Sequence, residues 1–427
     1  MTLSPDTDSR AEIQSLLDAT PSGGTLDLPA GSYFVTRAGS AYYALRVPAG
    51  VRVRGNGTTI RQAPGIGASV RTFQMDGAGA TLEHLTGDGD AANQTVDEHR
   101  AFAFVAAADC TLRGVTAHDF TGDGIYVYTG ADRALVENCT ATGNRRNGIT
   151  IAGGTGVRVY GGAFAGNAAQ QVDSEPGSPT HVDDVTIADA LIDSGTVAGF
   201  ALTISGSSSA SRSRGWRVTG CTIRGGVHVV WADDVIIAGN DIANGVSKFG
   251  IDAYRSCDGL TIARNTIAMT NAAMGFASAV AAVGTGGSSR PTNVNVVDNV
   301  ITCAAPSSLG LRFDGCGSVT AVGNRMVGAG IVNAGGAAIY ARATDPSVPF
   351  DLATFVGNVA AGFGSKGLAI QGNGASQLTR VRAVGNTFGD ANTVQGCGMS
   401  LDDGTHALQS SELMGNSYGS GVASGRL

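Results

Sequence analysis

One short unit recurs along this 427-residue chain and limits its possible folds more than any other feature. Each copy has apolar residues at alternate positions, then a glycine or polar residue, and usually an asparagine. Copies end at Asn56, Asn138, Asn240, Asn265, Asn299, Asn324, Asn358, Asn386 and Asn416, and equivalent units place Leu85, Val115, Gly162, Ala190 and Cys221 at that position. The spacing, from about 19 to 34 residues, is typical of solenoid coils with inserted loops.

This repeat predicts an all-β fold, a right-handed parallel β-helix solenoid of about fourteen coils. The alternation places apolar side chains inside each coil. Asparagine tolerates the left-handed conformation of a tight bend, and stacked asparagines can hydrogen-bond along the axis. The 64 glycines and the 15% of charged residues suit tightly stacked turns.

The ends of the repeat array predict the domain organisation. Ser9 and Glu12 have the spacing of a capping box, and Ile13, Leu16 and Leu17 form the apolar face of a short helix. Such a helix would cover the first coil, which otherwise exposes a free strand edge. We expect a cap over 1–42, the β-helix over 43–420, and a C-terminal tail over 421–427.

Composition excludes several classes of protein. The formal net charge of −7 lacks the basic footprint of a nucleic-acid binder. No run approaches the roughly 20 apolar residues of a membrane span, and residues 1–10 do not resemble a signal peptide. The seven cysteines form no C-x-x-C pair, so we expect buried thiols rather than a metal or redox site. No cofactor is expected, although the acidic loop from Asp88 through Asp90, Asp97 and Glu98 could bind calcium weakly.

Several stretches resemble a known superfamily. The runs TDSRAEIQSLLDA, GGTLDLPAGSY and LRVPAGVRVRGNGTTI resemble the opening of pectate-lyase-like β-helix proteins, including phage tailspike depolymerases, and GDGDAANQ, DGIYV, NRRNGITI and VDSEP look similar to that group. The resemblance implies a polysaccharide-acting fold, often a homotrimer, outside the cell or on a virion. The catalytic motifs of pectate lyases, polygalacturonases and mannuronan epimerases are absent from this sequence, so no catalytic residue is carried over from them.

A second strand in each coil places titratable and aromatic residues outward. Asp173 and Glu175, in VDSEP, lie two residues apart on one strand, so their carboxylates should be roughly 6 to 7 Å apart. That separation falls between the retaining and inverting geometries of glycosidases, and like charge should raise one pKa. The alternative is a pair of solvated acids before a proline turn.

A second cluster lies further along the same face. His228 and Asp252 lie on adjacent coils, about 4.8 Å apart, so the carboxylate could orient the imidazole for proton abstraction. The alternative is an ordinary surface pair. Candidate substrate-binding residues are Tyr126, Tyr128, Tyr254, Arg255 and Arg312, and the loops that carry Arg212, Arg214 and Arg290 could form the walls of the groove.

These features leave three hypotheses for function. The first is a polysaccharide-cleaving enzyme, a glycoside hydrolase that uses Asp173 and Glu175. The second is a polysaccharide lyase or uronate epimerase that uses His228 and Tyr254. The third belongs to another class, a non-catalytic carbohydrate-binding or structural appendage protein. In each case the expected partner is a polysaccharide, not a nucleic acid or a membrane.

Overall fold

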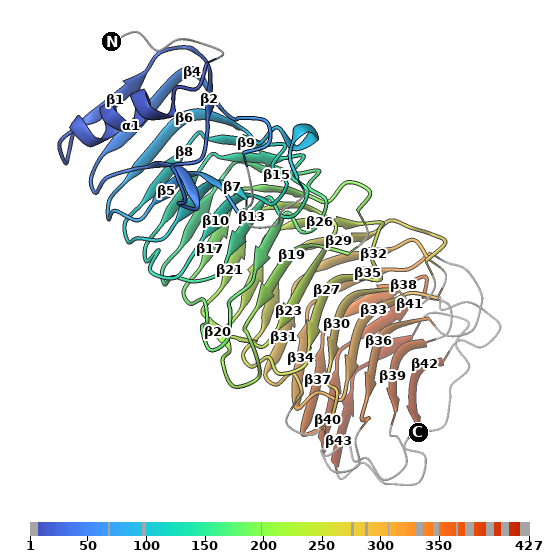
Figure 1. Ribbon diagram of the computed structural model, residues 1–427. Coiled ribbons are helices and arrows are strands. Elements are labelled where there is room, and N and C mark those ends of the chain that lie inside the picture. Colours follow the sequence, from blue (N-terminus) through green and yellow to red (C-terminus); the bar gives the residue numbers. More distant parts are fainter. Residues whose placement is uncertain are drawn as a thin grey trace. The chain divides into compact units, whose positions relative to one another are not determined.

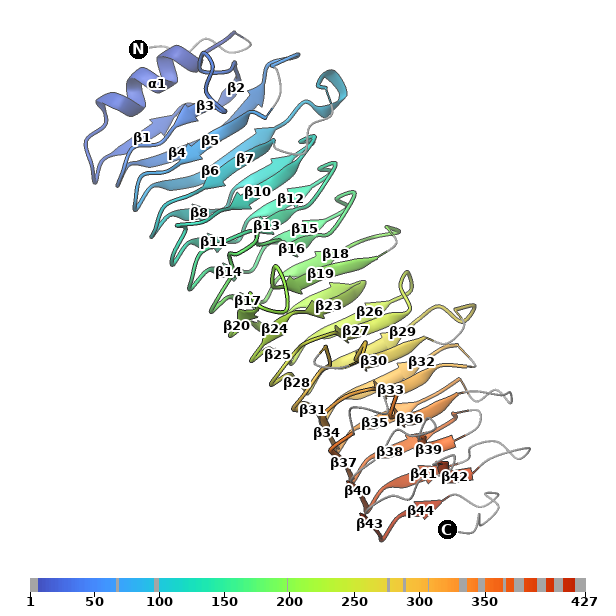
Figure 2. The ribbon, with the colours of Figure 1, turned by 60° about the horizontal axis from the view of Figure 1, so that its bottom comes forward.

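The computed structural model describes residues 7–66, 69–95, 100–197, 199–274, 277–286, 289–305, 307–329, 336–344, 350–363, 366–371, 380–389, 397–402 and 410–418. The chain divides into two compact units. Unit 1 comprises Met1–Val197 with Ala201–Ser207, and unit 2 comprises Ala198–Phe200 with Ser208–Leu427. Within each unit, parallel strands are stacked as successive coils (Figures 1 and 2). The predicted parallel β-helix is confirmed, with about 12 turns instead of fourteen.

Each coil contributes one strand to a sheet that we call the site sheet, because the candidate residues lie on it. In unit 1 this sheet contains β3 (Tyr43–Arg46), β5 (Arg71–Met75), β7 (Ala101–Val105), β10 (Asp123–Val127), β13 (Ile149–Ile151), β16 (Val172–Ser174) and the Ala201–Ser205 part of β19 (Phe200–Ser205). In unit 2 it contains β23 (Gly226–Val230), β27 (Phe249–Tyr254), β30 (Ser278–Val283), β33 (Leu309–Asp314), β36 (Ala337–Arg342), β39 (Lys366–Gln371) and β42 (Cys397–Asp402).

The other strands form what we call the ladder sheet, to which most coils contribute two strands. In unit 1 these are β1 (Thr25–Leu28), β2 (Gly31–Val35), β4 (Arg52–Gln62), β6 (Thr81–Asp88), β8 (Thr111–Arg113), β9 (Thr116–His118), β11 (Leu135–Glu137), β12 (Thr140–Thr142), β14 (Arg158–Tyr160), β15 (Ala163–Ala165), β17 (Thr186–Ala188) and β18 (Leu191–Asp193). A one-turn 3-10 helix, η1 (Ala91–Asn93), follows β6.

In unit 2 the ladder sheet contains β21 (Arg217–Thr219), β22 (Thr222–Arg224), β25 (Ile236–Ala238), β26 (Asp241–Asn244), β28 (Thr261–Ala263), β29 (Thr266–Met269), β31 (Val294–Val297), β32 (Val300–Cys303), β34 (Ser318–Val322), β35 (Arg325–Val327), β37 (Leu352–Val356), β38 (Val359–Ala361), β40 (Arg380–Val384), β41 (Thr387–Gly389), β43 (Ser410–Met414) and β44 (Ser417–Tyr418). A small separate sheet pairs β20 (Ser213–Arg214) with β24 (Ala232–Asp233).

The core is built from side chains stacked in register. On the site sheet of unit 1, Phe73, Ala103, Ile125, Ile149 and Val172 occupy equivalent positions on successive strands, and all five are fully buried. Because side chains alternate between the two faces of a strand, the neighbouring positions point away from this core. That alternation is what presents the candidate residues of this sheet.

One helix covers the first coil of unit 1, as predicted. Helix α1 (Arg10–Ala19) buries Ile13 and Leu17, while Leu16 is half-buried. The side chain of Gln14 accepts a hydrogen bond from the backbone N–H of Arg46 and donates one to its carbonyl, which satisfies the free edge of β3. The predicted capping box is wrong, because Ser9 is the N-cap residue but makes no side-chain bond to the helix.

A ladder of asparagines, buried from Asn240 to Asn386 and half-buried at Asn416, runs through unit 2, as predicted. From Asn240 to Asn386, each Nδ2 donates to the Oδ1 of the next asparagine at 2.9 or 3.0 Å and to a backbone carbonyl of the preceding coil. Each Oδ1 also accepts the backbone N–H of the preceding asparagine, at 2.9 to 3.1 Å. The members are Asn240, Asn265, Asn299, Asn324, Asn358, Asn386 and Asn416. The left-handed residue is the one before each asparagine, for example Arg264 and Asp298, so the bend itself does not require asparagine.

Two asparagines of the repeat do not occupy the ladder position. Asn56 and Asn138 are exposed, and the equivalent buried residues are Thr58 and Cys139. A bulge in β4 between Arg54 and Thr58 shifts the first unit, and Asn138 is itself the left-handed residue of its coil. In unit 1 a shorter ladder instead links the side chains of Asn144 and Asn167 on successive coils, and Asn167 donates in turn to Gln171 four residues later.

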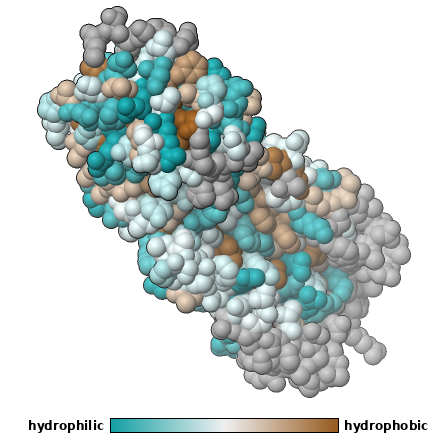
Figure 3. Space-filling view, in the orientation of Figure 1, coloured by the Kyte–Doolittle hydropathy of each residue, from teal (hydrophilic) through white to brown (hydrophobic). Residues whose placement is uncertain are grey.

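Other features of the surface and core agree with the sequence. The six cysteines whose side chains are described are free and buried, and burial raises the pKa of Cys257 to about 12. Among the described residues, no helix combines the length and apolar character needed to cross a membrane. In the view of Figure 3, hydrophobic residues form small separate groups among hydrophilic ones.

Candidate functional site

Three carboxylates and one arginine meet on the site sheet of unit 1. Asp123 begins β10, Asp173 lies in β16, and Glu175 follows that strand. Arg146, in the turn before β13, pairs with Asp123 (Nη1 to Oδ2, 2.8 Å) and through Nη2 with Glu175. Asn147, in the same turn, donates from its backbone N–H to Asp123 and from Nδ2 to Asp173 Oδ2 at 3.1 Å. The turn therefore holds all three acids together.

The acids differ in their environments. Glu175 is half-exposed and has a cation as its partner, whereas Asp173 is buried and accepts only the bond from Asn147 among the described residues. Burial, and then the charge of Glu175, raises the pKa of Asp173 to about 7 despite the nearby Arg146. Burial also raises the pKa of Asp123 to about 6. For Arg146, burial acts to lower the pKa, but Asp123 and Glu175 outweigh it and raise the value.

This arrangement differs from the sequence prediction at one residue. Asp173 was expected to face solvent, but it is only 8% exposed because the turn that carries Arg146 and Asn147 contacts it. Asp123, Arg146 and Asn147 are candidates that strand alternation does not predict. Asp123 lies two residues before the buried Ile125 on β10, so alternation predicts that it points into the core. Alternation makes no prediction for residues in a turn. The signal that could have found them is the NRRN turn one coil before VDSEP.

An aromatic surface lies on the same sheet beside the acids. The rings of Phe104 and Tyr126 are stacked with centroids 5.5 Å apart, and Tyr128 lies 5.3 Å from Phe104. Together with Arg146 and Glu175 these rings line a cleft of about 720 Å³. Tyr126 is half-buried, which raises its phenol pKa to about 12. The structure thus places Tyr126 and Tyr128, two of the predicted substrate-binding residues, beside the acids.

The histidine cluster lies in unit 2. His228 on β23 is in register with Asp252 on β27, and His228 Nδ1 lies 3.0 Å from Asp252 Oδ2. Phe200 stacks on the imidazole at 4.6 Å, and the Tyr254 ring lies 6.4 Å away. Asp252 is buried and fixes the ring through Nδ1, so Nε2 is the nitrogen left for proton transfer. The predicted contact of His228 with Asp252 is present.

The other predicted binding residues in unit 2 already have partners. The guanidinium of Arg255 lies over the rings of Trp231 and Tyr254, at 4.9 and 5.2 Å. Arg312 bonds Asp314 at 2.7 Å, and both line a smaller hollow of about 320 Å³. The loop arginines are also ion-paired, Arg212 and Arg214 with Asp233 and Arg290 with Asp351.

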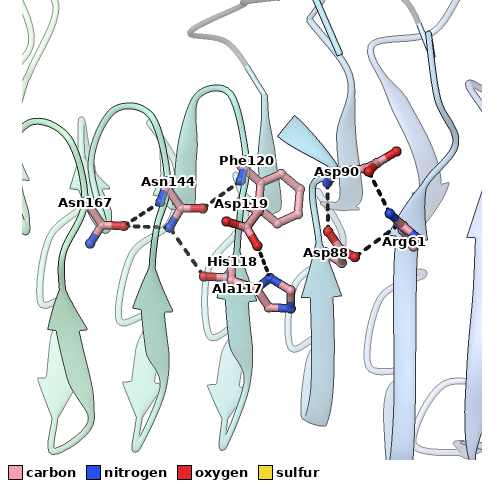
Figure 4. A network of polar contacts seen from close by, with 9 residues as sticks. All are labelled: Arg61, Asp88, Asp90, Ala117, His118, Asp119, Phe120, Asn144 and Asn167. Carbon is pink, nitrogen blue, oxygen red and sulfur yellow. Dashed lines mark hydrogen bonds and ion pairs between the residues drawn. The ribbon is translucent and has the colours of Figure 1, made fainter. Parts of the chain in front are cut away.

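One group in the described part of the chain has ligands close enough for a metal ion. Asp88, His118 and Asp119 lie on or after neighbouring strands of unit 1 (Figure 4). Arg61 pairs with both Asp88 (3.1 Å) and Asp90 (2.7 Å), and Asp119 bonds His118 Nδ1 at 2.8 Å. The charge of Arg61 already offsets that of Asp88, which weakens the attraction of this group for a cation. Asp97 and Glu98 of the predicted acidic loop lie outside the described residues.

The geometry defines the class, a right-handed parallel β-helix with acidic and aromatic residues on one sheet. The chain belongs to the family described as the right handed beta helix region, whose model matches residues 100–348. No curated protein matches the chain.

Solved structures share the fold at low identity. The A-module of a mannuronan C-5 epimerase from Azotobacter vinelandii is 17% identical, with a TM-score of 0.51 and coverage of 96% of this chain and 95% of that one. A surface adhesin of Streptococcus pneumoniae is 14% identical (TM-score 0.51, coverage 93% and 90%). A mutant tailspike protein of E. coli bacteriophage HK620, in complex with a pentasaccharide, is 13% identical (TM-score 0.58, coverage 97% and 76%).

Proposed function

We propose that this protein is a polysaccharide-cleaving enzyme, a glycoside hydrolase that acts in the cleft of unit 1. The observation that carries the proposal is the pair of unlike carboxyls: Asp173, whose pKa is raised to about 7, and Glu175, which is paired with Arg146. Two carboxyls whose environments differ in this way are what acid-assisted glycoside hydrolysis requires. The tailspike in complex with a pentasaccharide and the epimerase named for mannuronan share this fold, which supports a polysaccharide as the substrate.

In this mechanism the protonated Asp173 donates its proton to the glycosidic oxygen as the bond to the leaving sugar breaks. Glu175 then either attacks the anomeric carbon or removes a proton from the attacking water. Residues two apart on a strand place the carboxyls roughly 6 to 7 Å apart, between the ranges of the two stereochemical outcomes. Arg146 orients Glu175, and Asp123 fixes Arg146 from the other side.

The direct test is incubation of the purified protein with a panel of capsular, exopolysaccharide and plant polymers. A hydrolase releases new reducing ends without ultraviolet absorbance, whereas a lyase product absorbs through its new double bond. New reducing ends on at least one polymer are expected. Products that absorb would contradict the hydrolase and support the alternative below.

The pH dependence of turnover follows from the raised pKa of Asp173. The acid must be protonated to act, so kcat should fall about tenfold per pH unit above about 7. Because Asp123 titrates nearby, the midpoint belongs to the coupled pair. A rate that rises through pH 7 to 8 would contradict Asp173 as the acid.

The second candidate function is a lyase or uronate epimerase in unit 2, favoured by the oriented imidazole of His228. His228→Ala and Tyr254→Phe separate it from the hydrolase. If the cleft of unit 1 is the active site, each variant should lower turnover by less than about tenfold, whereas loss of a general base costs about 10² to 10⁴. Initial rates of each variant, measured with the reducing-end and absorbance assays on the same polymer, distinguish the two functions.

A non-catalytic carbohydrate-binding protein is the rival from another class. The adhesin of S. pneumoniae shares the fold, and a fold alone does not establish catalysis. Saturable polymer binding with no product over the whole panel would favour this function over both enzymes.

A further inference from the structure

Arg71 is a half-buried cation that has no anionic partner among the described residues. It begins β5, and its Cζ lies 3.7 Å from the ring centroid of Phe104. In the described part of the chain no carboxylate pairs with Arg71, and its buried Nε has no hydrogen-bond partner. Burial lowers the pKa of this guanidinium, yet arginine remains charged at neutral pH. A half-buried cation without a counter-ion is costly, so the position favours an anion that arrives with a ligand.

A second unsatisfied group lies three residues further along the same strand. Gln74 is in register with Phe104, and its buried Oε1 accepts no hydrogen bond from the described residues. Arg71, Gln74 and Phe104 line the same cleft as Glu175. The side chains in this part of the cleft therefore offer a planar guanidinium and an amide acceptor together, with Phe104 packed under the guanidinium.

Arg46 shows that an arginine on this sheet can be satisfied by the protein itself. It lies on β3, in register with Gln74, and its Nε bonds Asp76 at 2.8 Å. Its side chain is 58% exposed. Arg46 thus has a carboxylate partner on this sheet, whereas Arg71 has none among the described residues.

We propose that Arg71 binds the carboxylate of an acidic sugar, so that the polymer recognised by this protein is a carboxylate-bearing glycan. The planar guanidinium matches a carboxylate through two parallel hydrogen bonds. Gln74 accepts a hydrogen bond from a hydroxyl of the same sugar. The inference deepens the proposed function by naming the class of its substrate.

The proposed subsite lies away from the reacting bond. From β5 to β16, four strand spacings separate Gln74 from Asp173, on the order of 19 Å. Phe104, Tyr126 and Thr150 occupy the positions between them. This distance spans several sugar rings, so Arg71 selects the polymer and sets its register without contact with the bond that is cleaved.

The test compares acidic polymers with their own neutral forms. Polygalacturonate, alginate, hyaluronan and polysialic acid, each intact and carboxyl-reduced, are titrated against the wild-type protein and the Asp173→Asn variant, which does not consume the probe. The first three carry uronic acids and the last carries its carboxylate at the anomeric carbon, so the panel separates the two sources. At least one intact polymer should bind about tenfold or more tightly than its reduced form.

Arg71→Gln should abolish this preference, while Arg46→Gln, the matched exposed arginine, should retain it. Equal loss in both variants would indicate non-specific charge attraction and overturn the inference. So would equal binding of intact and reduced polymers, or no binding of any acidic polymer. The comparison of intact with reduced polymer needs no variant, so it decides the question even if Arg71→Gln does not fold.

These experiments distinguish failure of the Arg71 subsite from failure of the proposed hydrolase function. Hydrolysis of neutral polymers, unaffected by carboxyl reduction, would retain the hydrolase and reject the Arg71 subsite. Carboxylate-dependent binding through Arg71 without any product would retain the subsite and reject the hydrolase.

Discussion

Replacement of Asp173 by asparagine is expected to lower turnover by about 10² to 10⁴-fold while polymer binding is retained. An amide has nearly the shape of the protonated carboxyl and can accept the bond from Asn147, but it cannot donate a proton to a glycosidic oxygen. Glu175→Gln should have a comparable effect, because an amide neither attacks the anomeric carbon nor activates water. Initial rates on the cleaved polymer, with binding measured in parallel, check both variants.

Controls for these variants exist in unit 1. Asp109→Asn and Glu137→Gln each remove a carboxylate that is paired with an arginine, Arg133 and Arg113 respectively, and none of these residues lines the cleft. Both controls should keep turnover within about twofold, as expected for surface substitutions. Full activity in Asp173→Asn and Glu175→Gln would reject the site assignment.

The stability of Asp173→Asn has its own pH dependence, which follows from burial. The folded-state pKa of Asp173 is raised from 3.8 to about 7. The stabilising contribution of the neutral acid is therefore complete below about pH 3.8 and is lost as the pH rises through 7. Asparagine does not ionise, so the variant should match the wild type in acid and exceed it above pH 7. This sign is specific to a buried acid and would be absent if Asp173 were solvated.

The sequence predicts the fold well because a solenoid depends on local repetition. Each coil contacts only its neighbours, so alternation and the recurring asparagine are sufficient to predict the parallel strands, the buried column around Ile125 and the ladder. The first coils depart from the repeat because a bulge in β4 changes the residue that points inward, which places Thr58 instead of Asn56 at the buried position. Alternation cannot anticipate the two extra residues that β4 has opposite β6 at this bulge.

The site was predicted only in part, for the same physical reason. Tyr126 and Asp173 lie in strands, where parity determines which face a side chain occupies. Arg146 lies in a turn, and its partners come from strands one coil on either side, so its position depends on three-dimensional contacts. The burial of Asp173, and with it the raised pKa, is a consequence of that turn. Sequence spacing therefore locates the pair of acids but does not distinguish their roles.

The asparagine ladder is expected to carry a large share of the stability of unit 2. Asn299 is fully buried, donates to Asn324 and to the carbonyl of Ile262, and accepts from the backbone and the side chain of Asn265. Asn299→Ala leaves the buried backbone N–H of Asn265 without its acceptor and removes one hydrogen bond each from the side chains of Asn265 and Asn324 and from the carbonyl of Ile262. Since one unsatisfied buried group costs about 1 to 3 kcal/mol, we expect a loss of roughly 3 kcal/mol or more in the free energy of unfolding.

Asn295 provides the matched control on the preceding strand, β31, because its side chain is partly exposed and makes one hydrogen bond, of 3.3 Å, to the carbonyl of Asn293. Asn295→Ala should change the free energy of unfolding by no more than about 0.5 kcal/mol. Asn299→Asp keeps the shape of the side chain but replaces both donors with acceptors, so it should be at least as destabilising as alanine near neutral pH. Urea denaturation followed by circular dichroism measures all three. Equal midpoints for Asn299→Ala and Asn295→Ala would mean that the stacked amides follow from the fold without stabilising it, and that the apolar columns alone hold the coils of unit 2 together.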